Sequence, residues 1–256
     1  MKKTIFIITV AMLILPAFGF AQSETDIDSL LAKAEEKFDD GDEKESLDLY
    51  LEILDHDSEH YDALWNASMI YSRLGYQLGD EDEDTQLEYY EEALDLADRA
   101  KEFHEDRGHP YYVKAVALGR WSELQDTDTR IETSHEIKEN IERAAEMIPD
   151  YAPVWHLFGV FHSDVANVSS TERFAANLIS GGIPDASNEK AEEYLKKSID
   201  MMPESILFRL DLAKHYLKVD DEERAKDVLE EITKMEVKLP NEGPLKEEAA
   251  NILEDL

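Results

Sequence analysis

The sequence predicts an all-α fold, a right-handed superhelix of stacked helix pairs, and three observations lead to this prediction. A set of residues between positions 137 and 162 recurs between 191 and 216 after a constant step of 54 residues. The strong helix formers Ala, Leu, Glu and Lys dominate the composition, whereas the 256 residues include 10 Gly and 8 Pro. A hydrophobic content of 43% is enough for a sizeable core in a chain of this length.

The two copies share one spacing of residue types. The recurring residues are Ile137, Ile141, Ala144, Pro149, Trp155, Phe158, Gly159 and His162, matched in order by Ala191, Leu195, Ser198, Pro203, Arg209, Leu212, Ala213 and Tyr216. This spacing, A-x3-F-x2-A-x4-P followed by W-x2-L-G-x2-Y, is typical of the tetratricopeptide repeat, whose unit is about 34 residues of helix-turn-helix. The step exceeds one unit by 20 residues (54 − 34), which indicates an insertion.

The same register organises the rest of the chain into five helix pairs. Ala34 and Ser68 lie one 34-residue step apart, as do Ala191 and Ala225. Two other steps, of 47 and 44 residues, exceed one unit by 13 and 10 residues and indicate two further insertions. A capping helix at 244–256 should cover the exposed end of the stack. The expected pairs span about 26–57, 61–104, 110–148, 152–202 and 206–236.

The first two pairs show apolar residues at helical spacing, interrupted by one acidic run. This run, GDEDEDT at 79–85, is the first insertion, and Asp84 or Thr85 is the expected N-cap of the helix after it. The helices expected here are 26–39, 44–55, 61–74 and 88–101.

The later pairs follow the same pattern around a longer insertion at 167–188. In the third pair Thr133 or Ser134 is an alternative cap for a later helix start, and in the fourth Pro153 lies in a first turn, where proline is tolerated. The insertion should contain a short helix at 171–179 and then a glycine break. It could cover the inner face, pack outside or mediate homo-oligomer formation. The other expected helices are 111–124, 130–147, 206–219 and 222–235.

Small residues recur where the two helices of a pair should approach closely. A larger side chain at Gly159 or Ala213 would force the helices apart, at a cost of ~1–3 kcal/mol. Trp155 and Tyr216 should be core residues. The full set of expected structural positions is Ala34, Ser68, Tyr71, Trp155, Gly159, Ala191, Pro203, Ala213, Tyr216 and Ala225.

Residues 1–21 have the pattern of a secretory signal peptide. Lys2 and Lys3 precede an apolar run at 5–15, and small residues stand at the two positions that a signal peptidase recognises. An uncleaved anchor is the alternative, but the run is short for a membrane span. We therefore expect a periplasmic or secreted mature chain, 22–256, with no stable membrane insertion after cleavage. Since the chain has no Cys, its stability comes from packing rather than disulfides.

The formal net charge of −34 limits the kinds of partner that the chain can bind. A negative electrostatic field repels phosphates and anionic lipid headgroups, so nucleic acid is excluded as the main ligand. Self-repulsion of this size indicates adaptation to salt or to divalent cations.

Two segments resemble the regulator of microtubule dynamics family. They are RIETSHEIKENIERAAEMIPDYAPVWHLFG, starting at Arg130, and FAANLISGGIPDASNEKAEEYLKKSIDMMPESILFRLDLAKHYL, starting at Phe174. The resemblance implies a tetratricopeptide-like, non-enzymatic protein that acts through partners. A microtubule- or cytoskeleton-associated role, as in the eukaryotic members, is the alternative. The acidic charge disfavours it, because tubulin surfaces are acidic too.

Candidate binding residues lie on the first helix of each pair, which lines the concave groove of a tetratricopeptide superhelix. An aromatic side chain flanked by cations there would anchor a protein or peptide partner. The alternative for Trp65 is packing between neighbouring pairs. The candidates are Trp65, Met69, Arg73, His156, Val160, Lys214 and Lys218.

A calcium-responsive binding protein is a further alternative. Asp80, Asp82, Asp84 and Glu91 approach the spacing of a calcium loop, but Thr85 replaces the glycine that its sharp turn needs. We expect a solvated acidic loop and no cofactor. No Ser/His/Asp order, phosphate loop or HExxH motif is present, so we expect no enzyme activity.

Overall fold

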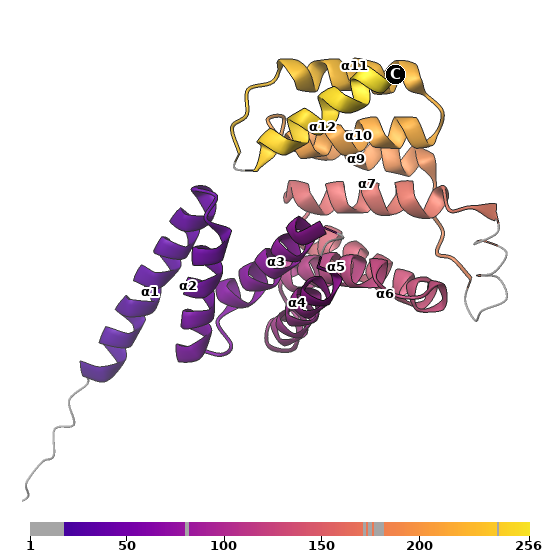
Figure 1. Ribbon diagram of the computed structural model, residues 1–256. Helices are drawn as coiled ribbons and strands as arrows, with labels where there is room; N and C mark the ends of the chain where they lie inside the picture. The colour runs from indigo at the N-terminus through magenta and orange to yellow at the C-terminus, as the bar shows by residue number, and fades with distance from the viewer. Residues whose placement is uncertain (1–17, 80–81, 171–172, 174–175, 177–181, 240) are drawn as a thin grey trace, which may run out of the picture.

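The computed structural model describes residues 18–79, 82–170, 173, 176, 182–239 and 241–256 (Figure 1). The described residues form an all-α, tetratricopeptide-like fold, as predicted. Of the expected leader, 1–17 lie outside the described residues and 18–21 belong to the first helix. The helices are α1 (Phe18–Asp39), α2 (Glu43–His56), α3 (Tyr61–Leu78), α4 (Glu83–Phe103), α5 (Gly108–Glu123), α6 (Thr127–Met147), α7 (Ala152–Ala166), α9 (Asn188–Met201), α10 (Ile206–Lys218), α11 (Glu222–Lys234) and α12 (Glu242–Asp255).

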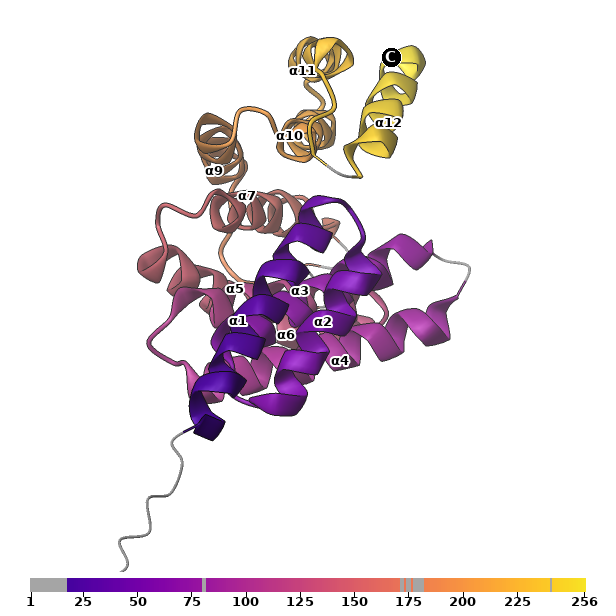
Figure 2. The same ribbon diagram turned by 90° about the vertical axis from the view of Figure 1, so that its left-hand side faces the viewer.

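The helices pack as successive pairs, α1 with α2, α3 with α4, α5 with α6, α7 with α9 and α10 with α11. The first helices of neighbouring pairs also touch, α3 on α5 and α7 on α10, and α12 packs on α10 and α11 as the cap of the stack. Figures 1 and 2 show the pairs turning progressively from α1 to α12. Among the described helices, none is long and apolar enough to span a bilayer.

Two of the three insertions lengthen helices instead of forming loops. α4 begins at Glu83 and runs for 21 residues, and its N-cap is Asp82, whose carboxylate accepts the amide of Thr85 at 3.3 Å. Asp84 and Thr85 are therefore inside the helix and are not its cap. The helix propensity of the charged run, together with an earlier cap, extends the helix where an acidic loop was expected.

The third pair shows the same effect. α6 begins at Thr127 and also runs for 21 residues, capped by Asp126, which accepts the amide of Thr129 at 2.9 Å. The alternative caps are wrong: Thr133 and Ser134 lie within the helix, where the Ser134 hydroxyl donates to the Ile131 carbonyl at 2.6 Å.

The small residues lie at helix crossings. A Cβ added to Gly159 would stand 2.6 Å from Leu195 Cγ and 2.9 Å from the Leu195 backbone nitrogen, so α7 and α9 touch there without room for a side chain. Ala34 and Ser68 are fully buried, and Ser46 Oγ donates across the first pair to the Ala34 carbonyl at 2.8 Å. Ala191, Ala213 and Ala225 are also fully buried.

Aromatic residues of the pattern fall into two classes. Tyr216 is 2% exposed and is a core residue. Trp155 differs from the expectation, because its indole is half-buried, with the Lys197 ammonium 3.1 Å from the ring centroid. Tyr71 is also half-buried and meets Tyr89 edge-on. Trp155 therefore packs at the edge of the core and is not fully buried in it.

In three pairs, a backbone carbonyl just before the first helix of the pair accepts the same kind of hydrogen bond. The donor is a side chain near the start of that helix, six residues after the carbonyl. The bonds are Tyr111 Oη to Glu105 at 3.0 Å, Trp155 Nε1 to Pro149 at 2.8 Å and Arg209 Nη1 to Pro203 at 2.5 Å.

The described end of the long insertion packs against α6 and α7. His135 Nε2 donates to the Gly182 carbonyl at 3.0 Å and Lys138 Nζ to the Asp185 carbonyl at 3.1 Å. On α7, His162 Nδ1 accepts the amide of Ser187 at 3.2 Å. Most of the expected helix at 171–179 lies outside the described residues.

Candidate functional site

The candidate residues lie along the first helices of the pairs, and we call their common surface the first-helix face. It is contributed by α3, α5, α7 and α10, and the residues that define it are Met69, Arg73, Tyr76, Val116, Arg120, His156, Val160, Lys214 and Lys218.

Trp65 packs between two pairs. Its indole stacks on His109 of α5 with 4.5 Å between ring centroids and donates to Asp62 at 3.2 Å. Tyr61 Oη lies 2.7 Å from His109 Nδ1 and completes this cluster. Burial lowers the pKa of His109 and so favours the neutral ring. This arrangement corresponds to the packing alternative for Trp65.

Met69 and Arg73 follow on α3. Met69 is half-buried against the core shared with α5 and α7. Arg73 donates to Glu43 from Nε at 2.8 Å and from Nη2 at 2.5 Å, and its guanidinium carbon lies 5.4 Å from the Phe38 ring centroid. Its side chain remains 37% exposed, so one edge can still meet a ligand.

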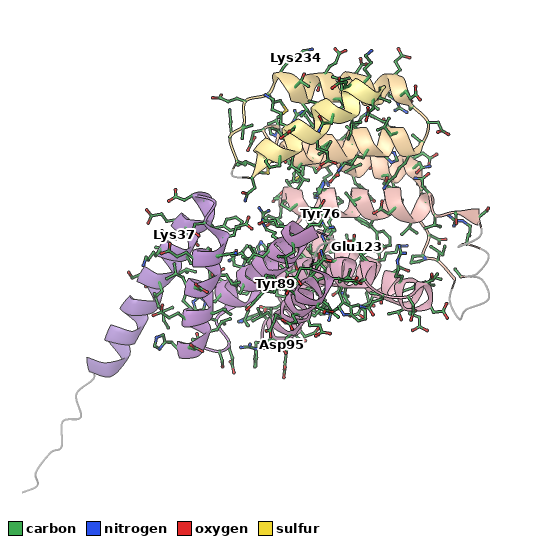
Figure 3. All side chains as sticks on the ribbon, in the orientation of Figure 1. Lys37, Tyr76, Tyr89, Asp95, Glu123 and Lys234 are labelled. Carbon is green, nitrogen blue, oxygen red and sulfur yellow. The ribbon has the colours of Figure 1, made fainter. Side chains whose placement is uncertain are left out.

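α5 contributes two residues that sequence reasoning missed. Arg120 lies 4.0 Å from the ring centroid of Tyr76, whose side chain is 53% exposed at the end of α3 (Figure 3). Val116 is half-buried one turn earlier. The 44-residue step was the available signal, since it places Val116 at the position of Val160 and Arg120 at that of Asp164.

His156 and Lys214 are brought together by one carboxylate. His156 Nε2 lies 2.8 Å from Asp211 of α10 and its ring stacks on Phe208 at 4.4 Å. Lys214 lies 3.9 Å from Asp211 and 2.7 Å from Glu248 of α12. Burial alone would raise the pKa of Asp211, but the His156 hydrogen bond and the nearby positive charges lower it overall.

Val160 and Lys218 complete the face. Val160 is half-buried against the cluster formed with α9 and α10. Lys218 pairs with Asp164 of α7, and both side chains stay about half-exposed. Beneath them Ser163 Oγ and His215 Nδ1 lie 2.9 Å apart.

The first-helix face therefore carries both half-buried apolar side chains and cations. Met69 and Val116 pack in one apolar cluster and Val160 in another, and Arg73, Arg120 and Lys218 each already face a carboxylate of the chain. Side chains of these two kinds can take apolar groups of a ligand and exchange ion pairs with it.

The candidate calcium residues do not converge. Asp82 caps α4, while Asp84 and Glu91 lie on that helix seven residues apart, which is about 10 Å along the axis. Asp80 lies outside the described residues. Over the described ranges, no group of three His, Cys, Asp or Glu side chains is placed to hold a metal ion.

Comparison with known families gives a match over most of the chain. Residues 30–256 match the family model described as regulator of microtubule dynamics protein 1-3. The chain is 26% identical over 200 residues to regulator of microtubule dynamics protein 1 of Mus musculus, covering 78% of this chain and 65% of that protein. It is 25% identical to protein 3 of Xenopus laevis, covering 77% of this chain and 42% of that protein.

The matched segment thus spans less than two thirds of each of these relatives. Among solved structures, a thermophilic TPR protein of Thermus thermophilus superposes with a TM-score of 0.66 at 16% identity, covering 89% of this chain and 98% of that one. This likeness shows the fold.

Proposed function

Because the chain belongs to the regulator of microtubule dynamics protein 1-3 family and has a tetratricopeptide-like fold, we propose that it is a non-enzymatic scaffold that binds a partner protein or peptide on the first-helix face. The observation that carries the proposal is that the first helices leave apolar side chains incompletely buried, namely Met69, Val116 and Val160, and expose Tyr76.

The cations of the face support the same assignment. Arg73, Arg120 and Lys218 each retain at least a third of their side-chain exposure, although each pairs with a carboxylate. Exposed pairs contribute only ~0–1 kcal/mol each, so a ligand carboxylate can replace one at little cost. A peptide with apolar and acidic side chains fits this pattern best.

We also propose that the mature chain acts in the periplasm or as a secreted protein. The support comes from the basic start and the apolar run of residues 1–21, which precede the family match at residue 30. Mass spectrometry of the protein purified from its own cells tests this, and a mature N-terminus at Gln22 is the expected result.

The scaffold proposal is tested by affinity capture followed by titration of the identified partner. The double variant Tyr76→Ala, Arg120→Ala should weaken the complex at least tenfold, whereas Arg143→Ala on α6, half-exposed and paired with Glu146, serves as the matched control. Equal affinity of both variants for the partner would place binding elsewhere.

Microtubule binding is the second candidate, favoured by the names of the relatives. The net charge of −34 opposes it at an acidic filament surface. Co-sedimentation with microtubules across a range of salt concentrations decides between the two.

A further inference from the structure

Glu43 is a buried carboxylate that joins three distant parts of the chain. The residue is 5% exposed at the start of α2. It accepts hydrogen bonds from Arg73 and, at 2.8 Å, from Gln77 Nε2, both on α3. A further donor is Asn241 Nδ2 at 3.0 Å, 198 residues away at the start of α12. Figures 1 and 2 both show the start of α12 beside the α1–α2 turn.

The partners of Glu43 differ in what they contribute. A buried carboxylate needs a charge and hydrogen bonds, and Arg73 with Gln77 supplies both from the adjacent pair. The amide of Asn241 is neutral and is therefore the weaker partner. The two ends of the stack can separate at Asn241 while Glu43 keeps its charged partner.

The start of α12 is attached in two directions. Asn241 reaches back to α2, whereas the next residue, Glu242, is 4% exposed and accepts the amide of Ile206 on α10 at 2.8 Å. Asn241 has the left-handed backbone angle φ 66°, and its side chain and that of Glu242 bond to different helices. Lys214 and Glu248 pair at 2.7 Å and also hold α12 on α10. The last pair and its cap therefore form one body, tied to the first pairs through Asn241.

This tie lies beside the first-helix face. Arg73, a residue of that face, binds the same Glu43 oxygen as Asn241. Tyr76, another residue of that face, follows Arg73 by three residues on α3.

We propose that the Glu43–Asn241 contact is a latch that holds the superhelix in a tightly wound state, and that a partner binds the first-helix face more tightly once the latch opens. The inference rests on the proposed scaffold function. Opening adds a conformational step to binding, so the apparent affinity is reduced by the fraction of molecules that are closed.

The latch is tested by a distance measurement on the full chain. Since the sequence has no Cys, spin labels can be placed at Lys37→Cys on α1 and Lys234→Cys on α11, at the two ends of the stack (Figure 3). Asn241→Asp puts a like charge against Glu43. Asn241→Gly removes the amide but keeps the left-handed backbone, which glycine adopts readily.

Both variants should shift the label distance to longer values and broaden its distribution. Asn167→Asp is the matched control, because it removes an amide that bonds locally to Ser163 and Asn188. Distributions of both Asn241 variants that superimpose on the wild type would overturn the latch. Melting curves verify that each variant is folded.

Binding is measured separately, with the partner identified by affinity capture. Asn241→Asp should lower its Kd several-fold. If the distances respond but neither form captures a specific protein, the scaffold function fails and the latch stands. If the distances do not respond, the latch fails whatever is captured.

Discussion

The contacts of α3 with α5 and of α7 with α10 occupy the same place in the repeat but differ in chemistry. The first contains a cluster of rings around Trp65, which stacks on His109. The second combines a ring stack, His156 on Phe208, with a carboxylate, Asp211, that His156 and Lys214 share. Aromatic packing is insensitive to salt, whereas charge pairs weaken as the salt concentration rises. The register therefore fixes where helices cross, while the chemistry of each crossing is free to vary.

Acid should destabilise the α7 side of this comparison most. His162 is 1% exposed, and burial, with Lys190 and Lys138 nearby, lowers its pKa from 6.5 to about 4. Between these values the unfolded chain binds more protons than the folded one. The contribution of neutral His162 to the free energy of unfolding is thus complete above pH 6.5. It is lost as the pH falls toward 4, by up to about 3 kcal/mol.

Urea denaturation at pH 7, 5.5 and 4.5 measures this loss. His162→Tyr, which installs the residue found at the matching position 216, should remove much of the pH dependence. A wild-type stability that stays constant from pH 7 to 4.5 would contradict the burial argument.

Truncating each crossing sharpens the comparison. Trp65→Ala should cost about 3 kcal/mol, the lower end for a large aromatic side chain because this one is half-buried. His156→Ala should cost about 1–2 kcal/mol, since it removes the hydrogen bond to Asp211 but leaves that carboxylate paired with Lys214. Denaturation midpoints at neutral pH give both values. Equal losses would contradict a larger contribution from the Trp65 ring cluster.

Two glycines on the first helices should respond with opposite signs. Gly159→Ala should destabilise by ~1–3 kcal/mol, because the new methyl meets the Leu195 backbone. Gly119→Ala on α5 meets nothing within 4 Å and should stabilise by about 0.5–1 kcal/mol through helix propensity. Thermal melts of the pair test this, and a stabilised Gly159→Ala would show that the α7–α9 crossing is loose.

The smallest effect is expected at the exposed border of the α7–α10 contact. Lys218→Met removes the pair with Asp164, whose side chain is 55% exposed, and should change stability by less than about 0.5 kcal/mol. A larger loss, measured in low salt and again in 0.5 M salt, would show that the pair belongs to a coupled network.

The repeat register was predictable because steric crowding at Ala34, Ser68 and Gly159 leaves a local trace in the sequence. The structure of the two shorter insertions was not predictable. Asp82 and Asp126 cap helices that begin in acidic runs, and an acidic run suits a solvated loop equally well. The α5 part of the face lay one 44-residue step from Val160 and could have been found. The contact between Glu43 and Asn241 leaves no such trace, because no periodicity links residues 198 apart.

The carbonyls that precede α5, α7 and α10 receive a phenol, an indole and a guanidinium respectively. At the corresponding place before α3, Leu64 cannot donate, and Arg99 of α4 supplies the bond to the Ser58 carbonyl at 2.9 Å instead. What persists at this place is a donor of sufficient reach, whatever residue or helix carries it. Distant members of such a family can therefore differ in the residue at this place and still keep the hydrogen bond to the carbonyl that precedes the first helix.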